Sequence, residues 1–422
     1  MRVNFLAKVA VAAIFVANKE TAGVAAILRR LKDVLGAGPP PPGPGVERWK
    51  HHSVYLEPAG GQEREHLTMK AEEWHLDIGA VSMRGKRPTD EDALVVDMAI
   101  YSHPNVRIQA LFDGHGGPHV AHYAANHLQS LFAKHRSLSR QTIEKICNDL
   151  DEELKMYKII HSGSTGVIVV IEKVEKPEQV TVRGRQIVGD PAITPLKEEY
   201  GQEASPAAQI TLGSPDAPFR LYVINVGDSR AMLLGGNDYY EMTKDHKPDD
   251  PEEKSRIERA GGFVTDETAR SVARVNGLLA VSRSFGDFLL KEPGSGDTPV
   301  ISKPDIRYFF ATYGDLLLLF CDGVTEPAEM SWAHVAAFAR ETFSQTNDVV
   351  KTATFLADKA YAAGSFDNIS TIVTSLRQEP AAVPVATLQA HVWTRDKLIT
   401  TLSEDWTHRL ETAKSNFFLP LF

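Results

Sequence analysis

Residues 106–117 read VRIQALFDGHGG, a run of strand-forming residues that ends in an acid set among glycines and a histidine. The apolar and β-branched residues up to Phe112 predict a β-strand. Asp113 follows directly, and a side chain at a strand end is held rigidly by the sheet. The glycines around His115 allow backbone or an ion to approach closely. This segment therefore predicts a strand that presents a fixed carboxylate.

The same arrangement, an acid at the end of a predicted strand, recurs four times. The acids are Glu91-Asp92 before a strand at Ala93, Asp228 after Leu221–Val226, Asp322 after Leu316–Cys321, and Asp367 before Ile369–Val373. A single Asp-Gly pair is more often a turn than a site. Carboxylates that converge from neighbouring strands repel each other, and a hard divalent cation removes that repulsion. Oxygen ligands favour Mg²⁺ or Mn²⁺ over zinc, so the pattern predicts a carboxylate-built metal site.

Short apolar runs separated by turn residues begin at Trp74 and indicate a mixed α and β domain. The runs typical of strands are 74–83, 93–100, 106–112, 164–172, 219–226, 230–234, 315–321 and 368–376. Helical periodicity occurs in 117–135, 140–160, 251–260, 331–344 and 348–363. Because strands and helices do not alternate one by one, we expect a mainly antiparallel α+β domain over 74–376.

Three segments differ in composition from this domain. Residues 36–45 read GAGPPPPGPG, a stiff linker within an N-terminal extension, 1–73, that precedes the domain. Residues 173–218 are rich in proline and are predicted to form a surface insertion between two strands. Residues 377–422 are predicted to form a C-terminal extension.

The first 35 residues are basic, and Glu20 is their first acid. Their apolar run, Val9–Ala17, is far shorter than the roughly 20 residues that a membrane span needs. The segment fits either an organelle presequence or a helix that packs on the domain or binds a partner. We therefore expect an intracellular protein, cytoplasmic or mitochondrial, without a membrane span.

The bulk composition is that of a globular protein, with 422 residues of which 43% are hydrophobic and 24% charged. The formal net charge of -9 argues against nucleic acid as a partner. Cys147 and Cys321 are the two cysteines, and neither lies in a CxxC pair. A disulfide framework and a cysteine-rich zinc site are therefore not expected.

Together the motifs resemble those of the type 2C metal-dependent protein phosphatases, and they follow that family's order. They are RPTDED (Arg87–Asp92), LFDGHGG (Leu111–Gly117), GSTG (Gly163–Gly166), NVGDSR (Asn225–Arg230), DHKP (Asp245–Pro248), AGGFV (Ala260–Val264), VNGLLAVSRSFGD (Val275–Asp287), CDG (Cys321–Gly323) and FDN (Phe366–Asn368). The resemblance implies two packed antiparallel sheets with helices on both outer faces. It also implies hydrolysis of phosphoserine and phosphothreonine in proteins, dependent on Mg²⁺ or Mn²⁺.

The resemblance further implies a role for each candidate residue. The implied metal ligands are Asp113 bridging two ions, Asp322 and Asp367 on the first, Glu91 and the carbonyl of Gly114 on the second, and Asp228 with Asp322 on a weaker third. Asp92 would orient the metal-bound water, Arg87 would bind the phosphate, and His115 would act as general acid.

These implied roles agree with the chemistry of phosphate esters. Two cations that share a water create a hydroxide, which attacks phosphorus directly. The fork of Arg87 can grip two phosphate oxygens, which a lysine cannot do. His115 can protonate the departing serine or threonine oxygen. Neither cysteine has the Cys-x5-Arg pattern of phosphatases that form a covalent intermediate.

Several other polar residues are expected to be structural. His119, His122 and His127 lie on a predicted helix, and no further motif completes a zinc site with them. Arg283 and Asp287 are expected to support the cleft without taking part in catalysis.

Two other functions are compatible with these motifs. The chain could be a pseudophosphatase, a binding or scaffold subunit without turnover; such relatives usually lack a metal acid or the arginine, and all are present here. It could also be a structural subunit of a larger assembly, anchored by residues 1–70 or 377–422.

One departure from the family is Val324–Pro327, where many relatives carry a tryptophan and an aspartate. The expected partners are phosphoprotein substrates and a protein bound through either extension.

Overall fold

The structure is a computed structural model of the chain. It describes residues 49–56, 64–71, 74, 76–100, 102–159, 161–188, 206–265, 272–291, 298–377, 388–394 and 397–402. Side chains are described between residues 74 and 377, within those ranges. The predicted presequence or helix and the proline-rich linker lie outside the described residues.

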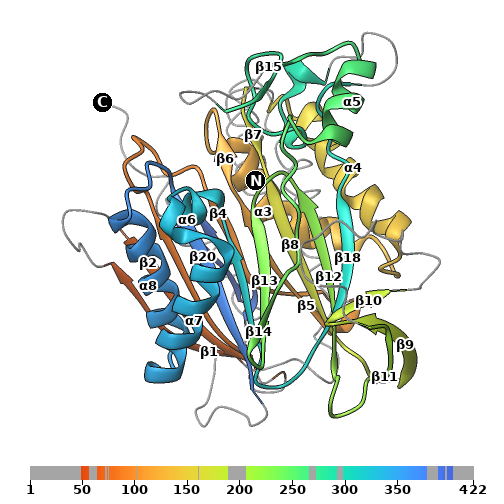
Figure 1. Cartoon of the computed structure of the whole chain (residues 1–422), viewed down its shortest axis with the longest axis vertical. Coiled ribbons are helices and arrows are strands. Elements are labelled where there is room, and N and C mark those ends of the chain that lie inside the picture. The colour runs from red at the N-terminus through yellow and green to blue at the C-terminus, as the bar shows by residue number, and fades with distance from the viewer. Residues whose placement is uncertain are drawn as a thin grey trace, which may run out of the picture. The chain divides into compact units, whose positions relative to one another are not determined.

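Two large antiparallel sheets form the centre of the domain (Figure 1). In the described part of the chain, the smaller sheet has seven strands in the order β1 (Trp49–Leu56), β2 (Arg64–Ala71), β3 (Leu76–Met83), β20 (Ile369–Leu376), β19 (Leu316–Phe320), β13 (Arg230–Gly235) and β14 (Asp238–Glu241). The larger sheet has ten described strands in the order β11 (Ala208–Leu212), β9 (Glu178–Arg183), β10 (Gln186–Val188), β18 (Asp305–Ala311), β12 (Phe219–Val226), β8 (Gly166–Lys173), β5 (His103–Phe112), β4 (Ala93–Ile100), β21 (Leu388–Thr394) and β22 (Lys397–Leu402).

Two small sheets lie at the ends of the large strands. One joins β17 (Phe285–Gly286), β7 (Gly163–Ser164) and β6 (Gly114–His115), and the other pairs β15 (Val264–Thr265) with β16 (Arg274–Val275). The described helices are α3 (His119–Ala133), α4 (Arg140–Met156), α5 (Pro251–Arg259), α6 (Asp322–Thr325), α7 (Trp332–Thr346) and α8 (Val349–Ala362), with short 3₁₀ turns η1 (Phe288–Leu290) and η2 (Ala328–Met330).

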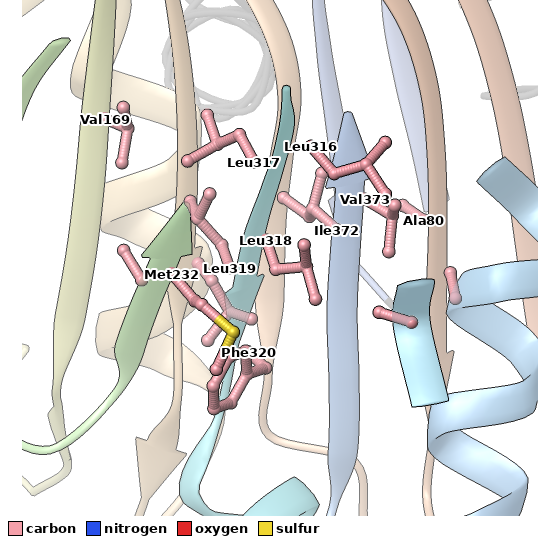
Figure 2. Close-up of a cluster of buried hydrophobic side chains, with 14 of the residues drawn as sticks. Ala80, Val169, Met232, Leu316, Leu317, Leu318, Leu319, Phe320, Ile372 and Val373 are labelled. Carbon is pink, nitrogen blue, oxygen red and sulfur yellow. The ribbon is translucent and has the colours of Figure 1, made fainter. Parts of the chain in front are cut away.

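Side chains of both large sheets interlock in one buried core. Figure 2 shows part of it, in which Leu316–Phe320 of β19 lie among Val169, Met232 and Ile372 from neighbouring strands. Along β8 the side chains alternate between two faces, as a strand requires. Val167, Val169 and Ile171 belong to this core, whereas Ile168 and Val170 belong to the cluster beneath the helices of the other face.

Helices cover the outer face of each sheet. α8 packs on β3 and β20 with α7 beside it, whereas α3 packs on β4 and β5 with α4 beside it (Figure 1). Local sequence explains where these helices begin, because side chains cap their free N–H groups. Ser139 accepts from Thr142 at the start of α4, and Asp348 accepts from Val350 at the start of α8. The predicted four-layer α+β architecture is confirmed.

The predicted strands and helices of the domain are present, but additional strands enlarge both sheets. The described parts of the predicted insertion form β9, β10 and β11, which extend the larger sheet beyond β18. Residues of the predicted extensions form β1 and β2 at one edge of the smaller sheet and β21 and β22 at one edge of the larger sheet. No described helix is both long and apolar enough to cross a membrane.

Candidate metal and phosphate site

Strand register places three of the predicted acids at one end of the larger sheet. Ala93 pairs with Phe112, so Asp92 before β4 lies beside Asp113 after β5. Gly166 at the start of β8 pairs with Val226 at the end of β12, so Asp228 emerges at the same end. Antiparallel pairing therefore brings together residues that are far apart in the chain.

The smaller sheet presents the remaining acids in the same way. Ile369 pairs with Met83, so the segment after β3 that carries Arg87 and Glu91 emerges next to Asp367. β19 pairs with β20 through Phe320 and Thr371, which places Asp322 at that end as well.

The carboxylates of the two sheets lie close enough to perturb one another. Burial raises the pKa of Asp113 well above its ordinary value, and the charges of Asp92, Asp322, Asp367 and Asp228 raise it further. Acids from both sheets therefore form a single cluster, which we call the acid cluster: Asp92, Asp113, Asp228, Asp322 and Asp367. Such a cluster binds protons or cations strongly, because either removes the repulsion.

Asp92 is the most enclosed part of the acid cluster. Its side chain is buried, and a hydrogen bond from the Ser370 side chain lowers its pKa without offsetting burial. Burial raises its pKa well above the usual range, with further contributions from Asp90, Asp367 and Asp322. Burial of a carboxylate is costly, and a cation in the cluster would offset that cost. The donor set therefore fits a hard divalent ion.

Asp322 and Asp367 respond to the same surroundings. Burial and the charge of Asp228 together raise the pKa of Asp322 to about 7, although the charge of Lys247 opposes the change. The pKa of Asp367 is raised by burial, although Arg87 opposes the change.

Glu91 and Gly114, the predicted ligands of the second ion, are neighbours. A Cβ at position 114 would overlap the backbone carbonyl of Glu91, so only glycine permits this approach. The Glu91 carboxylate accepts hydrogen bonds from Thr89 Oγ1 and from the N–H of Gly117, both at 2.9 Å. The segment before β4, which carries Thr89, and the glycine-rich turn after β6, which carries Gly117, therefore both orient the Glu91 carboxylate.

Two side-chain cations are bound directly to the acid cluster. Arg87 Nη2 donates to Asp367 Oδ2 at 2.6 Å, and the ammonium of Lys247 donates to Asp228. In the described residues, no three His, Cys, Asp or Glu side chains are arranged to hold a metal ion as they stand. A cation at Asp367 or Asp228 would therefore compete with Arg87 or Lys247 for the carboxylate. Lys247 lies in the DHKP motif, but no sequence pattern predicts that it contacts the acid cluster.

His115 lies at the edge of the site with its ring held by Asp287. His115 Nε2 and Asp287 Oδ2 are 2.8 Å apart. Burial lowers the pKa of His115, but the hydrogen bond and the charge of Asp287 outweigh burial and leave the pKa raised. Burial alone would raise the pKa of Asp287, but its contact with His115 leaves that pKa lowered. The pair therefore favours a charged imidazolium next to a carboxylate, the form that can donate a proton.

The other histidines singled out by the sequence lie on α3. His127 Nδ1 contacts the carbonyl of Tyr123 at 2.8 Å, and its ring stacks on the Tyr123 ring with centroids 3.8 Å apart.

The sequence departure at Val324–Pro327 has a structural explanation, because Glu326 accepts hydrogen bonds at 2.8 Å from Ser365 Oγ and the N–H of Phe366. Glu326 thus supports the turn that carries Asp367.

The two packed antiparallel sheets thus carry the acid cluster at one edge, with Arg87 and His115 beside it. Comparison with known proteins identifies the family. A family profile described as "Protein phosphatase 2C" matches residues 76–178 and 207–369. The unmatched residues 179–206 lie within the predicted insertion.

Individual members of this family are similar to the chain in sequence and structure. "Probable protein phosphatase 2C 6" of Paramecium tetraurelia is 32% identical over 293 residues, which are 68% of this chain and 86% of the relative. "Protein phosphatase 1A" of Homo sapiens is 30% identical over 317 residues, which are 74% of this chain and 73% of the relative. The crystal structure of a phosphatase from Toxoplasma gondii matches with a TM-score of 0.66 and 37% identity, covering 76% of this chain and 97% of the other. The chain belongs to the protein phosphatase 2C family of metal-dependent protein phosphatases.

Proposed function

We propose that the chain hydrolyses phosphoserine and phosphothreonine in proteins, with two Mg²⁺ or Mn²⁺ ions held by the acid cluster. The observation that carries this proposal is the convergence of carboxylates from both sheets on Asp113, whose pKa is raised by burial and by the charges of Asp92, Asp322, Asp367 and Asp228. When bound, the ions would supply an activated water and neutralise charge on the phosphoryl oxygens.

Each residue of the site has a distinct part in this proposal. Asp113, which interacts with acids from both sheets, would bridge the ions. Asp322 and Asp367 would hold one ion, Glu91 and the carbonyl of Gly114 the other, and Asp228 a weaker third ion with Asp322. The buried Asp92 would orient the attacking water.

The remaining two residues would act on the substrate. Arg87 is half exposed beside Asp367, so its guanidinium can turn towards a phosphate without leaving the site. Two parallel N–H donors fit two phosphoryl oxygens. His115 would donate a proton to the departing serine or threonine oxygen, which is a poor leaving group as an alkoxide.

A second function has one observation in its favour. Arg87 and Lys247 already neutralise two carboxylates, as they would in a pseudophosphatase that binds a partner without turnover. The two functions differ in whether added Mg²⁺ or Mn²⁺ produces phosphate release.

The test is release of phosphate from a phosphothreonine peptide with EDTA, Mg²⁺ or Mn²⁺, for the unaltered chain and Asp113→Asn. We expect metal-dependent turnover that Asp113→Asn abolishes, because the substitution removes the charge shared by both ions. Asp216→Asn makes the same chemical change on an exposed turn and should retain full activity. Folded protein that releases no phosphate with any metal would support the pseudophosphatase, and an active Asp113→Asn would exclude the bridging role.

A further inference from the structure

Sequence patterns predict only a supporting role for Asp287. We propose that Asp287 is the positioning residue for the acid of the reaction: it holds His115 by Nε2 and leaves Nδ1 to deliver the proton. This inference rests on the proposed function, in which His115 protonates the departing oxygen.

His115 and Asp287 meet across the small sheet of β17, β7 and β6. Gly163 of the central strand pairs with His115 on one side and with Gly286 on the other. The two side chains reach each other over Gly163, with 2.8 Å between His115 Nε2 and Asp287 Oδ2. A Cβ at position 163 would overlap both of these atoms, so glycine is required where the side chains meet.

The backbone of Asp287 has a conformation that serves this contact. Its φ of 51° and ψ of 39° lie in the left-handed region, which most residues with a Cβ avoid and which Asp and Asn adopt more readily. Strain of this kind persists where the surroundings hold it in place, and it concentrates at functional sites. Here the Asp287 N–H donates to the carbonyl of Ser162 at 3.2 Å, and Ser284 Oγ donates to Asp287 Oδ2 at 2.6 Å.

The turn that carries Asp287 is also held from behind by helix α4. Asp151, which is 8% exposed, accepts from the N–H of Gly286 at 2.8 Å and from Lys291 Nζ at 2.6 Å. Lys291 Nζ in turn donates to the carbonyl of Ser284 at 2.7 Å. A buried ion pair therefore fixes both ends of the turn and, through it, the direction of the Asp287 carboxylate.

In this arrangement, the two N–H protons of the His115 ring have different roles. The bond between phosphorus and the serine or threonine oxygen breaks while a water oxygen bonds to phosphorus. The Nδ1 proton of His115 passes to the departing oxygen, and the next water to be activated returns a proton to the ring. Asp287 stays ionised throughout, holding the Nε2 proton and stabilising the charged ring, as a carboxylate behind a catalytic histidine does.

The experiment compares two substrates whose leaving groups differ in their need for a proton. A phosphothreonine peptide needs one, whereas p-nitrophenyl phosphate does not. Asp287→Asn keeps the shape of the side chain and removes its charge. We expect it to lower kcat on the peptide by about tenfold or more and on the aryl phosphate by less than about threefold. Circular dichroism and Tm establish that the variant is folded, with Asp216→Asn as the matched control.

A double variant distinguishes positioning from a general structural effect. If Asp287 acts through His115, Asp287→Asn should lower peptide turnover no further once His115→Gln is present. Equal losses on both substrates, or a full additional loss in the double variant, would overturn the positioning role. Ser284→Ala removes one hydrogen bond from Asp287, and it should give a smaller loss with the same substrate dependence; a loss equal on both substrates would count against the proposal.

Different results would count against the positioning role of Asp287 and against the proposed phosphatase function. If His115→Gln slows both substrates equally, the acid role of His115 is wrong and Asp287 loses its part with it. If His115→Gln is selective for the peptide and Asp287→Asn is not, only the positioning role is wrong. If the unaltered chain releases no phosphate with either metal, the phosphatase function itself fails.

Discussion

Arg87 and Asp367 are joined by a hydrogen-bonded ion pair of 2.6 Å between Nη2 and Oδ2. The proposed phosphate ligand is thus bound to a proposed metal ligand. A cation that takes Asp367 would release Arg87 for the substrate, so metal binding and phosphate binding should be linked. The 53% exposure of the Arg87 side chain leaves room for this movement.

Arg87→Lys should lower kcat/KM on a phosphothreonine peptide by about 10- to 100-fold. Lysine keeps the charge but cannot donate to two phosphoryl oxygens at once, and a charge-assisted hydrogen bond contributes about 1.5–3 kcal/mol. Steady-state kinetics at saturating Mn²⁺ measure the effect. Arg136→Lys, on an exposed turn between α3 and α4, is the matched control. Unchanged kcat/KM in Arg87→Lys would exclude a two-point grip on the phosphate.

Lys247→Met should strengthen the binding of a further cation at Asp228. The ammonium of Lys247 now neutralises that carboxylate. The pKa of Lys247 is raised because the charges of Asp228, Asp322 and Asp245 outweigh burial. Without this competitor, calorimetric titration of metal-free protein with Mn²⁺ should show a site about tenfold tighter, which corresponds to roughly 1.4 kcal/mol. Lys244→Met, which removes an ammonium 2.7 Å from Asp250, should leave the titration unchanged. Identical titrations for the two variants would show that Lys247 does not compete with a cation.

The stability of the metal-free protein should fall as pH rises from about 4 to about 7. The folded-state pKa of Asp322 is about 7, whereas an unfolded aspartate has a pKa near its ordinary value of 3.8. The folded state therefore binds a proton that the unfolded state releases, and this contribution to stability is lost as pH rises through the folded-state pKa. Denaturant unfolding in EDTA should show the decrease in the unaltered chain. Asp322→Asn should lack this component, on the order of a few kcal/mol.

Added Mn²⁺ provides a second check on this pH dependence. If cations replace the protons of the acid cluster, saturating Mn²⁺ should remove most of the decrease in the unaltered chain. A decrease of the same size in Asp322→Asn would show that other groups cause it.

Arg107→Met should destabilise the fold by about 3–5 kcal/mol without changing the chemistry of the site. Arg107 donates to both oxygens of Asp97, at 3.1 and 2.7 Å, and both residues are buried between β4 and β5. Removing the arginine leaves a buried carboxylate, whereas Asp97→Leu combined with Arg107→Met should recover much of the loss. Denaturant unfolding measures both variants. Near-equal stability of Arg107→Met and the unaltered chain would contradict the expected cost of the unpaired acid.

Much of the fold could be predicted because its strands and helices carry strong local patterns. The apolar runs of β19 and β12 are evident without tertiary contacts. β18 was missed because Asp305 and Arg307 interrupt its apolar pattern; in the fold, Asp305 pairs with Arg283 at 2.9 Å. β9 and β11 are short and polar, and they are strands because they pair with each other at the end of an existing sheet.

The acids of the candidate site could also be predicted, because each stands beside a strand whose pattern is clear. Their roles as ligands remain predictions. The partners of the charged residues could not be foreseen in the same way. Asp287 belongs to a motif, but nothing in that motif indicates that its carboxylate faces His115.

By itself, the sequence determined most of the central strands and helices and which acids stand at strand ends, because these depend on local patterns of apolar residues and turns. Only the tertiary structure decided which of these charges meet. Arg87 and Asp367 are 280 residues apart, and His115 and Asp287 are 172 apart. Such pairs depend on the order and register of strands in the sheets, where small shifts change which side chains lie together. The physical reason is that a side chain's partner is set by packing between distant segments, which no local pattern encodes.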